Sequence, residues 1–174
     1  ITHNVVGDSL YAIKTTNGDW KKLWIRSLTS GTYYFTFSDF DGSNEQNQYA
    51  QKYQDSTANF LYYSLDFVCP FINYEPSKQD WDITFTKYIT PVQGMAYGVT
   101  GVLSNSGVKV AQVDNLPSPS NYIDYSQHSM MTEMNTIGYD WKEFDMSLFS
   151  YSLNPNRCYF IKDLNDKIWR VIFT

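Results

Sequence analysis

The feature that most constrains this chain is a pattern that occurs twice. Residues 1–25 align without a gap on residues 149–173, at a constant offset of 148 positions. Each copy is a strand-like run, a turn and a second strand-like run, and Asn17-Gly18 is a strong signal for a tight hairpin turn. We therefore expect the same β-hairpin to be used twice. Matching positions are Tyr11 and Tyr159, Ile13 and Ile161, Lys14 and Lys162, and Asn17 and Asn165.

The repeat also predicts an organisation into modules. Residues 1–42 are expected to form a meander that ends one module, residues 43–58 a connection, and residues 59–174 a second module that lacks its C-terminal strand. These parts can still pack as one compact unit. On this interpretation the native polypeptide continues beyond the sequence at both ends.

A third strand-like stretch lies between the two hairpins. In Trp81 to Tyr88 the apolar residues Trp81, Ile83 and Phe85 alternate with polar ones, which is the period of a strand with one apolar face. Pro76 and Pro91 bracket the stretch and disfavour a helix. We expect it to be the core strand around which the hairpins pack.

The remaining segments are assigned by the same signals. Strands are expected at 32–37, 60–67 and 68–73, and residues 44–58 are expected to form an edge strand, a connection or a short helix. Residues 94–101 are expected to be flexible. The runs 102–103 and 108–113 flank an Asn105-Ser106-Gly107 turn and are expected to form a hairpin. Some helix is expected in 122–137.

Composition agrees with an all-β fold of antiparallel sheets with long loops and little helix. Aromatic residues make up 18% of the 174 residues, including 15 Tyr, and such rings pack well on pleated surfaces. They serve either cross-strand packing or a platform for a flat ring or a sugar. A net charge of −5 without a basic run argues against a nucleic-acid partner. No apolar run reaches the ~18 residues of a transmembrane span.

Several motifs match one known family. Trp81-Asp82-Ile83-Thr84-Phe85 has the form of a Trp-Asp-(Ile/Leu)-Ala-Phe strand, and Asp140 to Met146 has the form of the run before a closing hairpin. Tyr159 to Phe173 matches the closing hairpin, and Tyr11 to Ile25 matches it again. In these stretches the chain resembles the HmuY-like family of Bacteroidetes surface lipoproteins and secreted repeats. The likeness covers most of residues 56–174, and residues 1–42 resemble the end of a preceding module.

The resemblance implies a sandwich-like all-β fold, a secreted or cell-surface location, often through type IX secretion, and a non-enzymatic binding role within a longer surface polypeptide. Known family members act as hemophore-like proteins that hold haem through two axial His or Met side chains. Haem ligands are soft or imidazole donors that face an apolar pocket. The candidates in this chain are Met95, His128, Met130, Met131 and Met134. The alternative role of these Met residues is to fill gaps in the core.

Other residue patterns give weaker candidates. Asp39, Asp41, Asn44 and Glu45 surround a glycine and could supply oxygen ligands to Ca²⁺, or form a solvated turn. Cys69 and Cys158 are either a disulfide between strands or two buried thiols. Asp80 and Asp82 share a strand face but are expected to be solvated rather than catalytic. No role is expected for His3. A carbohydrate-binding or adhesive repeat module is the alternative function, with Trp20, Trp24 or Trp141 stacking on sugars.

Overall fold

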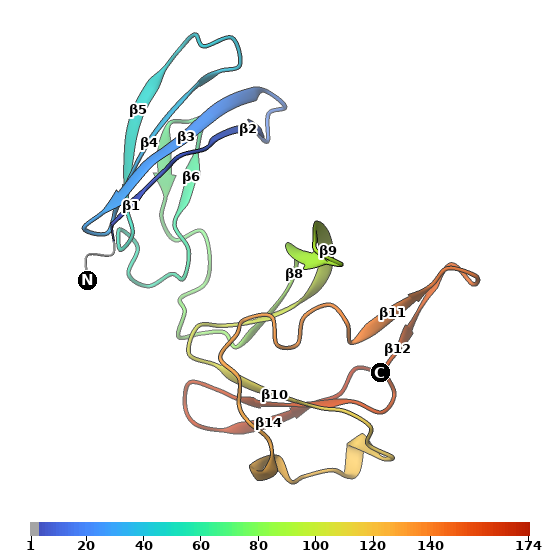
Figure 1. Cartoon of the computed structure of the whole chain (residues 1–174). Coiled ribbons are helices and arrows are strands. Elements are labelled where there is room, and N and C mark those ends of the chain that lie inside the picture. Colours follow the sequence, from blue (N-terminus) through green and yellow to red (C-terminus); the bar gives the residue numbers. More distant parts are fainter. Residues whose placement is uncertain (1–3) are drawn as a thin grey trace. The chain divides into compact units, whose positions relative to one another are not determined.

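Antiparallel sheets make up the computed structural model, which describes residues 4–174 (Figure 1). The chain divides into unit 1, Ile1–Ser77, and unit 2, Lys78–Thr174, and each has its own core. The predicted all-β class is confirmed. Helix within residues 4–174 is limited to two short 3-10 turns, η1 (Pro119–Asn121) and η2 (Tyr125–Gln127). Neither has the length or apolar character needed to cross a bilayer.

Unit 1 is built on a five-stranded sheet. Strand β3 (Trp20–Thr29) pairs with β4 (Thr32–Asp39) on one side, and β4 pairs in turn with β5 (Gln46–Gln51). On its other side β3 pairs with both β1 (Val5–Val6) and β2 (Leu10–Lys14). The expected boundaries at 42 and 58 therefore lie inside unit 1, because β5 belongs to this sheet.

A short hairpin covers one face of the unit 1 sheet. Strands β6 (Tyr62–Ser64) and β7 (Cys69–Phe71) pair with each other, and Tyr63 makes an edge-to-face contact with Phe35 at a centroid distance of 4.9 Å. Phe35 and Phe37 are buried and Leu23 packs against them. This hairpin therefore shares a core with the main sheet, as the alternation of β4 requires.

Strand β13 (Cys158–Lys162) is the centre of unit 2. It pairs with β10 (Lys109–Val113) on one side and β14 (Ile168–Val171) on the other. Tyr159 and Ile161 face one apolar cluster, while Cys158 and Phe160 face a second. Both faces of β13 are thus buried, which explains why this run is apolar without alternation.

Two further hairpins extend from this centre. Strand β8 (Ile83–Val92) pairs along its length with β9 (Met95–Ser104), and β11 (Lys142–Asp145) pairs with β12 (Ser150–Leu153). The β8–β9 pair joins the rest of unit 2 through a bridge between Val102 and Gly138.

The repeated hairpin is confirmed in its pairing register. Tyr11 pairs with Leu23 and Lys14 with Trp20, and 148 positions later Tyr159 pairs with Val171 and Lys162 with Ile168. The turns agree as well, because Thr15 N–H donates to the Asp19 carbonyl at 2.8 Å and Asp163 N–H donates to the Lys167 carbonyl at 3.0 Å. Sequence identity at these positions therefore reflects the same local structure.

The two copies diverge just before the hairpin, and one residue explains why. Gly7 N–H donates to the Arg26 carbonyl, and a side chain at Gly7 would meet the Ile25 carbonyl oxygen at 1.6 Å. The residue 148 positions later is Pro155, which has no N–H and carries a ring. The strand before Gly7, β1, pairs with β3, whereas the corresponding β12 pairs with β11.

Two expectations for residues 94–113 are wrong. Residues 94–101 are not a flexible segment, because Met95 to Gly101 pair continuously with β8. The Asn105 turn forms, but it joins strands of different sheets and not a hairpin. The Asn105 side chain donates to the carbonyls of Trp81 and Lys78, at 2.5 and 2.7 Å, which ties this turn to the segment before β8.

The expectation that Trp81 to Tyr88 is the core strand is also wrong. Only its first part packs inward, where Ile83 joins the cluster around Val102, while Phe85 is exposed. Apolar and polar residues do alternate along β8, but other residues of unit 2 pack against its apolar side only near Ile83. Strand β13 has the central place.

Candidate functional site

His128 and Met130, two of the haem-ligand candidates, line the same hollow of unit 2. The hollow has a volume of about 310 Å³ and lies beside η2 and the β13–β14 hairpin. The 3-10 turn closes through a hydrogen bond from the His128 N–H to the Tyr125 carbonyl at 3.2 Å, so His128 is the residue that ends the turn. The lining residues are Tyr125, Ser126, His128, Met130, Lys162, Asp166 and Ile168.

Packing against β13 and β14 positions the imidazole. Tyr122 OH lies 2.7 Å from Nε2 of His128, and the Tyr122 ring packs near Phe160. The Tyr122 carbonyl accepts a hydrogen bond of 2.7 Å from Nη1 of Arg170. Since Nε2 is engaged, Nδ1 is the ring nitrogen left to a ligand. Lys162 adds a cation at the rim, and its hydrogen bond to Asp166 raises its pKa.

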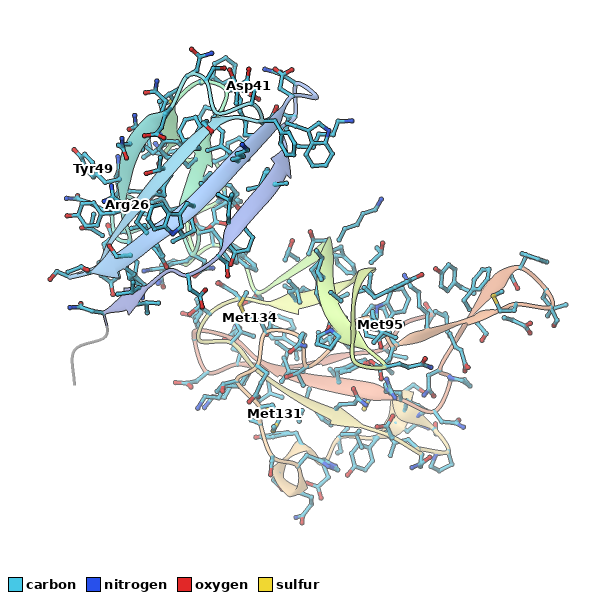
Figure 2. All side chains as sticks on the ribbon, turned by 45° about the horizontal axis from the view of Figure 1, so that its top comes forward. Arg26, Asp41, Tyr49, Met95, Met131 and Met134 are labelled. Carbon is cyan, nitrogen blue, oxygen red and sulfur yellow. The ribbon has the colours of Figure 1, made fainter. Side chains whose placement is uncertain are left out.

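The other methionine candidates do not join this hollow. Met95 is 68% exposed where β8 turns into β9, and Figure 2 shows it well apart from Met131 and Met134. The Met134 backbone carbonyl accepts a hydrogen bond of 2.7 Å from the Ser104 N–H, which ties this residue to the end of β9. Met131 forms a backbone bridge with Val110. His3 lies outside the described residues.

The acidic turn after β4 holds its carboxylates with hydrogen bonds. Asp39 is paired with Lys21 and accepts from Asn44 Nδ2 at 2.6 Å, and Asp41 accepts from Ser43 Oγ at 2.7 Å. The Lys21 and Asn44 hydrogen bonds lower the pKa of Asp39. Glu45 follows the turn. The residues described contain no cluster of three or more His, Cys, Asp or Glu placed for a metal, and Ca²⁺ binding stays a prediction.

The two cysteines are free thiols. Cys158 is fully buried in the second cluster of unit 2, where burial raises its pKa, and Cys69 is half-buried in β7 of unit 1. Each packs with its own unit, so of the two alternatives the structure has thiols rather than a disulfide, and only Cys158 is deeply buried.

The tryptophans proposed for sugar stacking differ in exposure. Trp20 and Trp24 are exposed on β3, but Trp141 is half-buried and stacks on Phe173 at a centroid distance of 4.3 Å. Trp141 is therefore a core residue, not an exposed platform. Trp169, which the sequence did not single out, is exposed and donates through Nε1 to Asp163 at 2.8 Å.

Asp82 is an exposed residue just before β8. Burial raises the pKa of Asp82, and the next cause is the charge of Asp163, which comes from the turn after β13. Asp163 itself is the acceptor of the Trp169 bond and of two backbone N–H groups in that turn. The carboxylate of Asp163 therefore stabilises the turn between β13 and β14.

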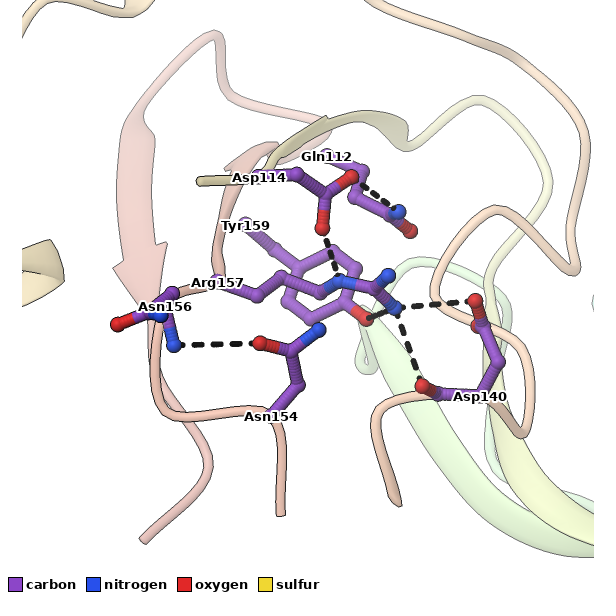
Figure 3. A network of polar contacts seen from close by, with 7 residues as sticks. All are labelled: Gln112, Asp114, Asp140, Asn154, Asn156, Arg157 and Tyr159. Carbon is purple, nitrogen blue, oxygen red and sulfur yellow. Dashed lines mark hydrogen bonds and ion pairs between the residues drawn. The ribbon is translucent and has the colours of Figure 1, made fainter. Parts of the chain in front are cut away.

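A polar network that the sequence did not indicate is centred on Arg157 (Figure 3). Its guanidinium, 12% exposed, contacts Asp114 at 2.5 Å, Asp140 at 3.0 Å and Tyr159 OH at 3.3 Å. Burial alone would lower the pKa of Arg157, but these hydrogen bonds raise it. Burial would raise the pKa of Asp114, yet hydrogen bonds from Gln112 and Arg157 lower it. The network joins three segments of unit 2 and is structural.

Each unit also has one larger hollow. One, of about 680 Å³, lies between β9 and the β11–β12 hairpin, and Tyr97, Tyr151 and Glu143 are among the residues that line it. The other, of about 650 Å³, lies in unit 1 between the β2–β3 hairpin and β6–β7. Its lining is mostly apolar, with Ile13, Leu23, Ile25, Phe35, Tyr63 and Phe71 among the residues that form it.

Comparison with protein-family models, curated proteins and solved structures gave no match.

Proposed function

We propose that this chain is a non-enzymatic binding module of the HmuY-like type, from a secreted or cell-surface polypeptide, and that it binds haem or a related porphyrin in unit 2. The observation that carries the proposal is the meeting of His128 and Met130 in one hollow. An imidazole and a thioether are both axial ligands of haem iron, which would supply the bond between ligand and protein. The repeated hairpin supports the modular part.

The residues around the hollow suit such a ligand chemically. Tyr125 offers an aromatic face, and Lys162 offers a cation for a propionate-like carboxylate. With its proton on Nε2, His128 donates to Tyr122 OH, which holds the ring orientation and leaves the unprotonated Nδ1 as the expected ligand atom. A volume of about 310 Å³ is at the small end of ligand pockets, so part of a macrocycle would stay exposed.

Absorption spectroscopy tests the proposal directly. The full chain is titrated with ferric and ferrous haem, and a shifted Soret band is expected. His128→Ala should abolish the shift and Met130→Leu should change the band position, because leucine keeps the size but lacks the sulfur. Met95→Leu is the matched control and should behave as the parent chain. Absence of a shift in both redox states would refute haem binding.

A carbohydrate-binding module is the second candidate, favoured by the hollow beside β9. Its tyrosine rings and the carboxylate of Glu143 combine an apolar surface with hydrogen-bond acceptors, as a sugar requires. Binding on a glycan array that is lost in Tyr151→Ala but retained in His128→Ala would favour this function over haem.

A further inference from the structure

The two copies of the hairpin have the same internal pairing but different neighbours. In unit 2, β13 is flanked on its far edge by β10, with Val110 opposite Ile161 and Gln112 opposite Tyr159. The equivalent edge in unit 1 belongs to β2, which pairs with β3 alone among residues 4–174 (Figure 1). Its backbone groups there form an open row that a further strand can pair with.

Side-chain burial differs in the same way. Tyr159 is 1% exposed, whereas Tyr11, its counterpart, is 52% exposed. Ile161 and Phe173 lie in a cluster with Val102, Val110 and Ile137 from unit 2. Their counterparts Ile13 and Ile25 line the hollow of about 650 Å³. The unit 1 hollow therefore occupies the place that the β8–β10 region fills in unit 2.

The relation also holds in the opposite direction. In unit 1 the outer edge of β3 is paired with β4, where Leu23 lies opposite Phe37. In unit 2 the corresponding edge of β14 has no strand partner among the described residues. Each unit thus supplies strands that the other copy of the hairpin lacks. A hairpin with both sets of neighbours would sit in a four-stranded sheet. Its first strand (β2 or β13) would pair with a strand like β10, and its second strand (β3 or β14) would pair with a strand like β4.

We propose that the open edge of β2 and the adjoining hollow of unit 1 are a docking site for a polypeptide segment of the β8–β10 type. The occupant is an extended strand with branched apolar residues at alternate positions, like Val108 and Val110, pairing antiparallel with Leu10–Lys14. The observed register of β10 with β13 places its equivalent of Val110 opposite Ile13. This is β-strand addition with a side-chain pocket. This docking proposal rests on the repeated module of the proposed function and does not depend on haem binding.

A chain extension provides the test. A second copy of residues 78–148 is joined directly before Ile1 of the full chain, because the constant offset of 148 places residue 148 immediately ahead of that position. Hydrogen exchange of the Leu10–Lys14 amides is then measured by mass spectrometry. We expect exchange there to slow by about a hundredfold or more, since an exposed edge becomes an internal strand.

The matched control is the same extension with Val102→Asp and Val110→Asp in the added copy only. It should leave the exchange of Leu10–Lys14 as in the parent chain, and exchange of the original Cys158–Lys162 should be unchanged in all three proteins. Unchanged exchange of Leu10–Lys14 in the intact extension, or equal protection by the control, would overturn the proposal. The haem titration is read separately, so failure of one proposal does not affect the other.

Discussion

The matched isoleucines of the two hairpins allow a direct measurement of what tertiary burial contributes. Ile161 and Ile13 have the same place in the same register, opposite Trp169 and Lys21 respectively. Ile161 is 3% exposed within the main cluster of unit 2, and Ile13 is half-buried at the wall of a hollow. The perturbation is Ile→Ala at each position in turn.

Burial sets the expected magnitudes. The change removes three carbons, worth about 0.8 kcal/mol each on full burial, and a cavity in a packed core adds about 1 kcal/mol. Ile161→Ala should therefore destabilise unit 2 by about 3 kcal/mol. Ile13→Ala should cost about 1 kcal/mol in unit 1, because only half of its surface is buried and the space beside it is already open.

The assay has to report on each unit separately, since a chain with two units need not unfold in one step. Native-state hydrogen exchange gives an opening free energy for each strand. We expect the β13 amides to exchange about a hundredfold faster in Ile161→Ala, and the β2 amides less than about tenfold faster in Ile13→Ala. Ile161→Val, with an expected cost of about 1 kcal/mol, is the fallback if the alanine variant does not fold. Equal losses at both positions would refute the reasoning.

Unit 2 offers three further tests. Arg157→Ala should lower its stability by about 1–2 kcal/mol in thermal unfolding. The Arg157 side chain is mostly buried and its hydrogen bonds to Asp114, Asp140 and Tyr159 OH are lost, while the exposed carboxylates can be hydrated instead. The folded-state pKa of Asp114 is lowered, so this deficit should be present above about pH 4 and shrink as pH falls through the folded pKa; a deficit independent of pH would contradict the assignment. Gly101→Ala should lower the stability of unit 2 by about 1–3 kcal/mol in the same measurement, since the new Cβ would clash with the Gly138 carbonyl oxygen. Gly98→Ala on the same strand is the control: its Cβ meets open space, so stability should stay the same or rise. The Cys158 thiol should resist a thiol reagent until urea unfolds unit 2, and rapid native labelling of both cysteines would show that its burial is wrong.

Local signals predicted the hairpins well because the information lies within a few residues. The expected strand Leu10 to Lys14 coincides with β2, and Asn17-Gly18 forms the turn with Gly18 at a φ of 97°. The same turn in the second copy places Asp166 at a φ of 64°. Both conformations follow from the pairing of the two strands that the turn connects.

Pairing between distant segments was predicted less well. Alternation marked β8 as a strand with an apolar face, but it did not indicate that Phe85 would remain exposed. The Asn105 turn was placed correctly and its strands were assigned to the wrong partners, because β10 pairs with β13 about fifty residues later. The Arg157 network had no sequence signal, since its carboxylates lie far apart along the chain.

The sequence by itself determined the all-β class and the repeated hairpin, including its register and turn, because period, turn chemistry and β propensity act over neighbouring residues. Only the tertiary structure decided which copy is buried. Tyr159 has β10 beside it and an apolar cluster around it, while the identical Tyr11 lies on an open edge. The same side chain in the same local structure differs in burial because burial depends on strands supplied from elsewhere in the chain. That difference identifies the open side of unit 1 as the place where a further strand can bind.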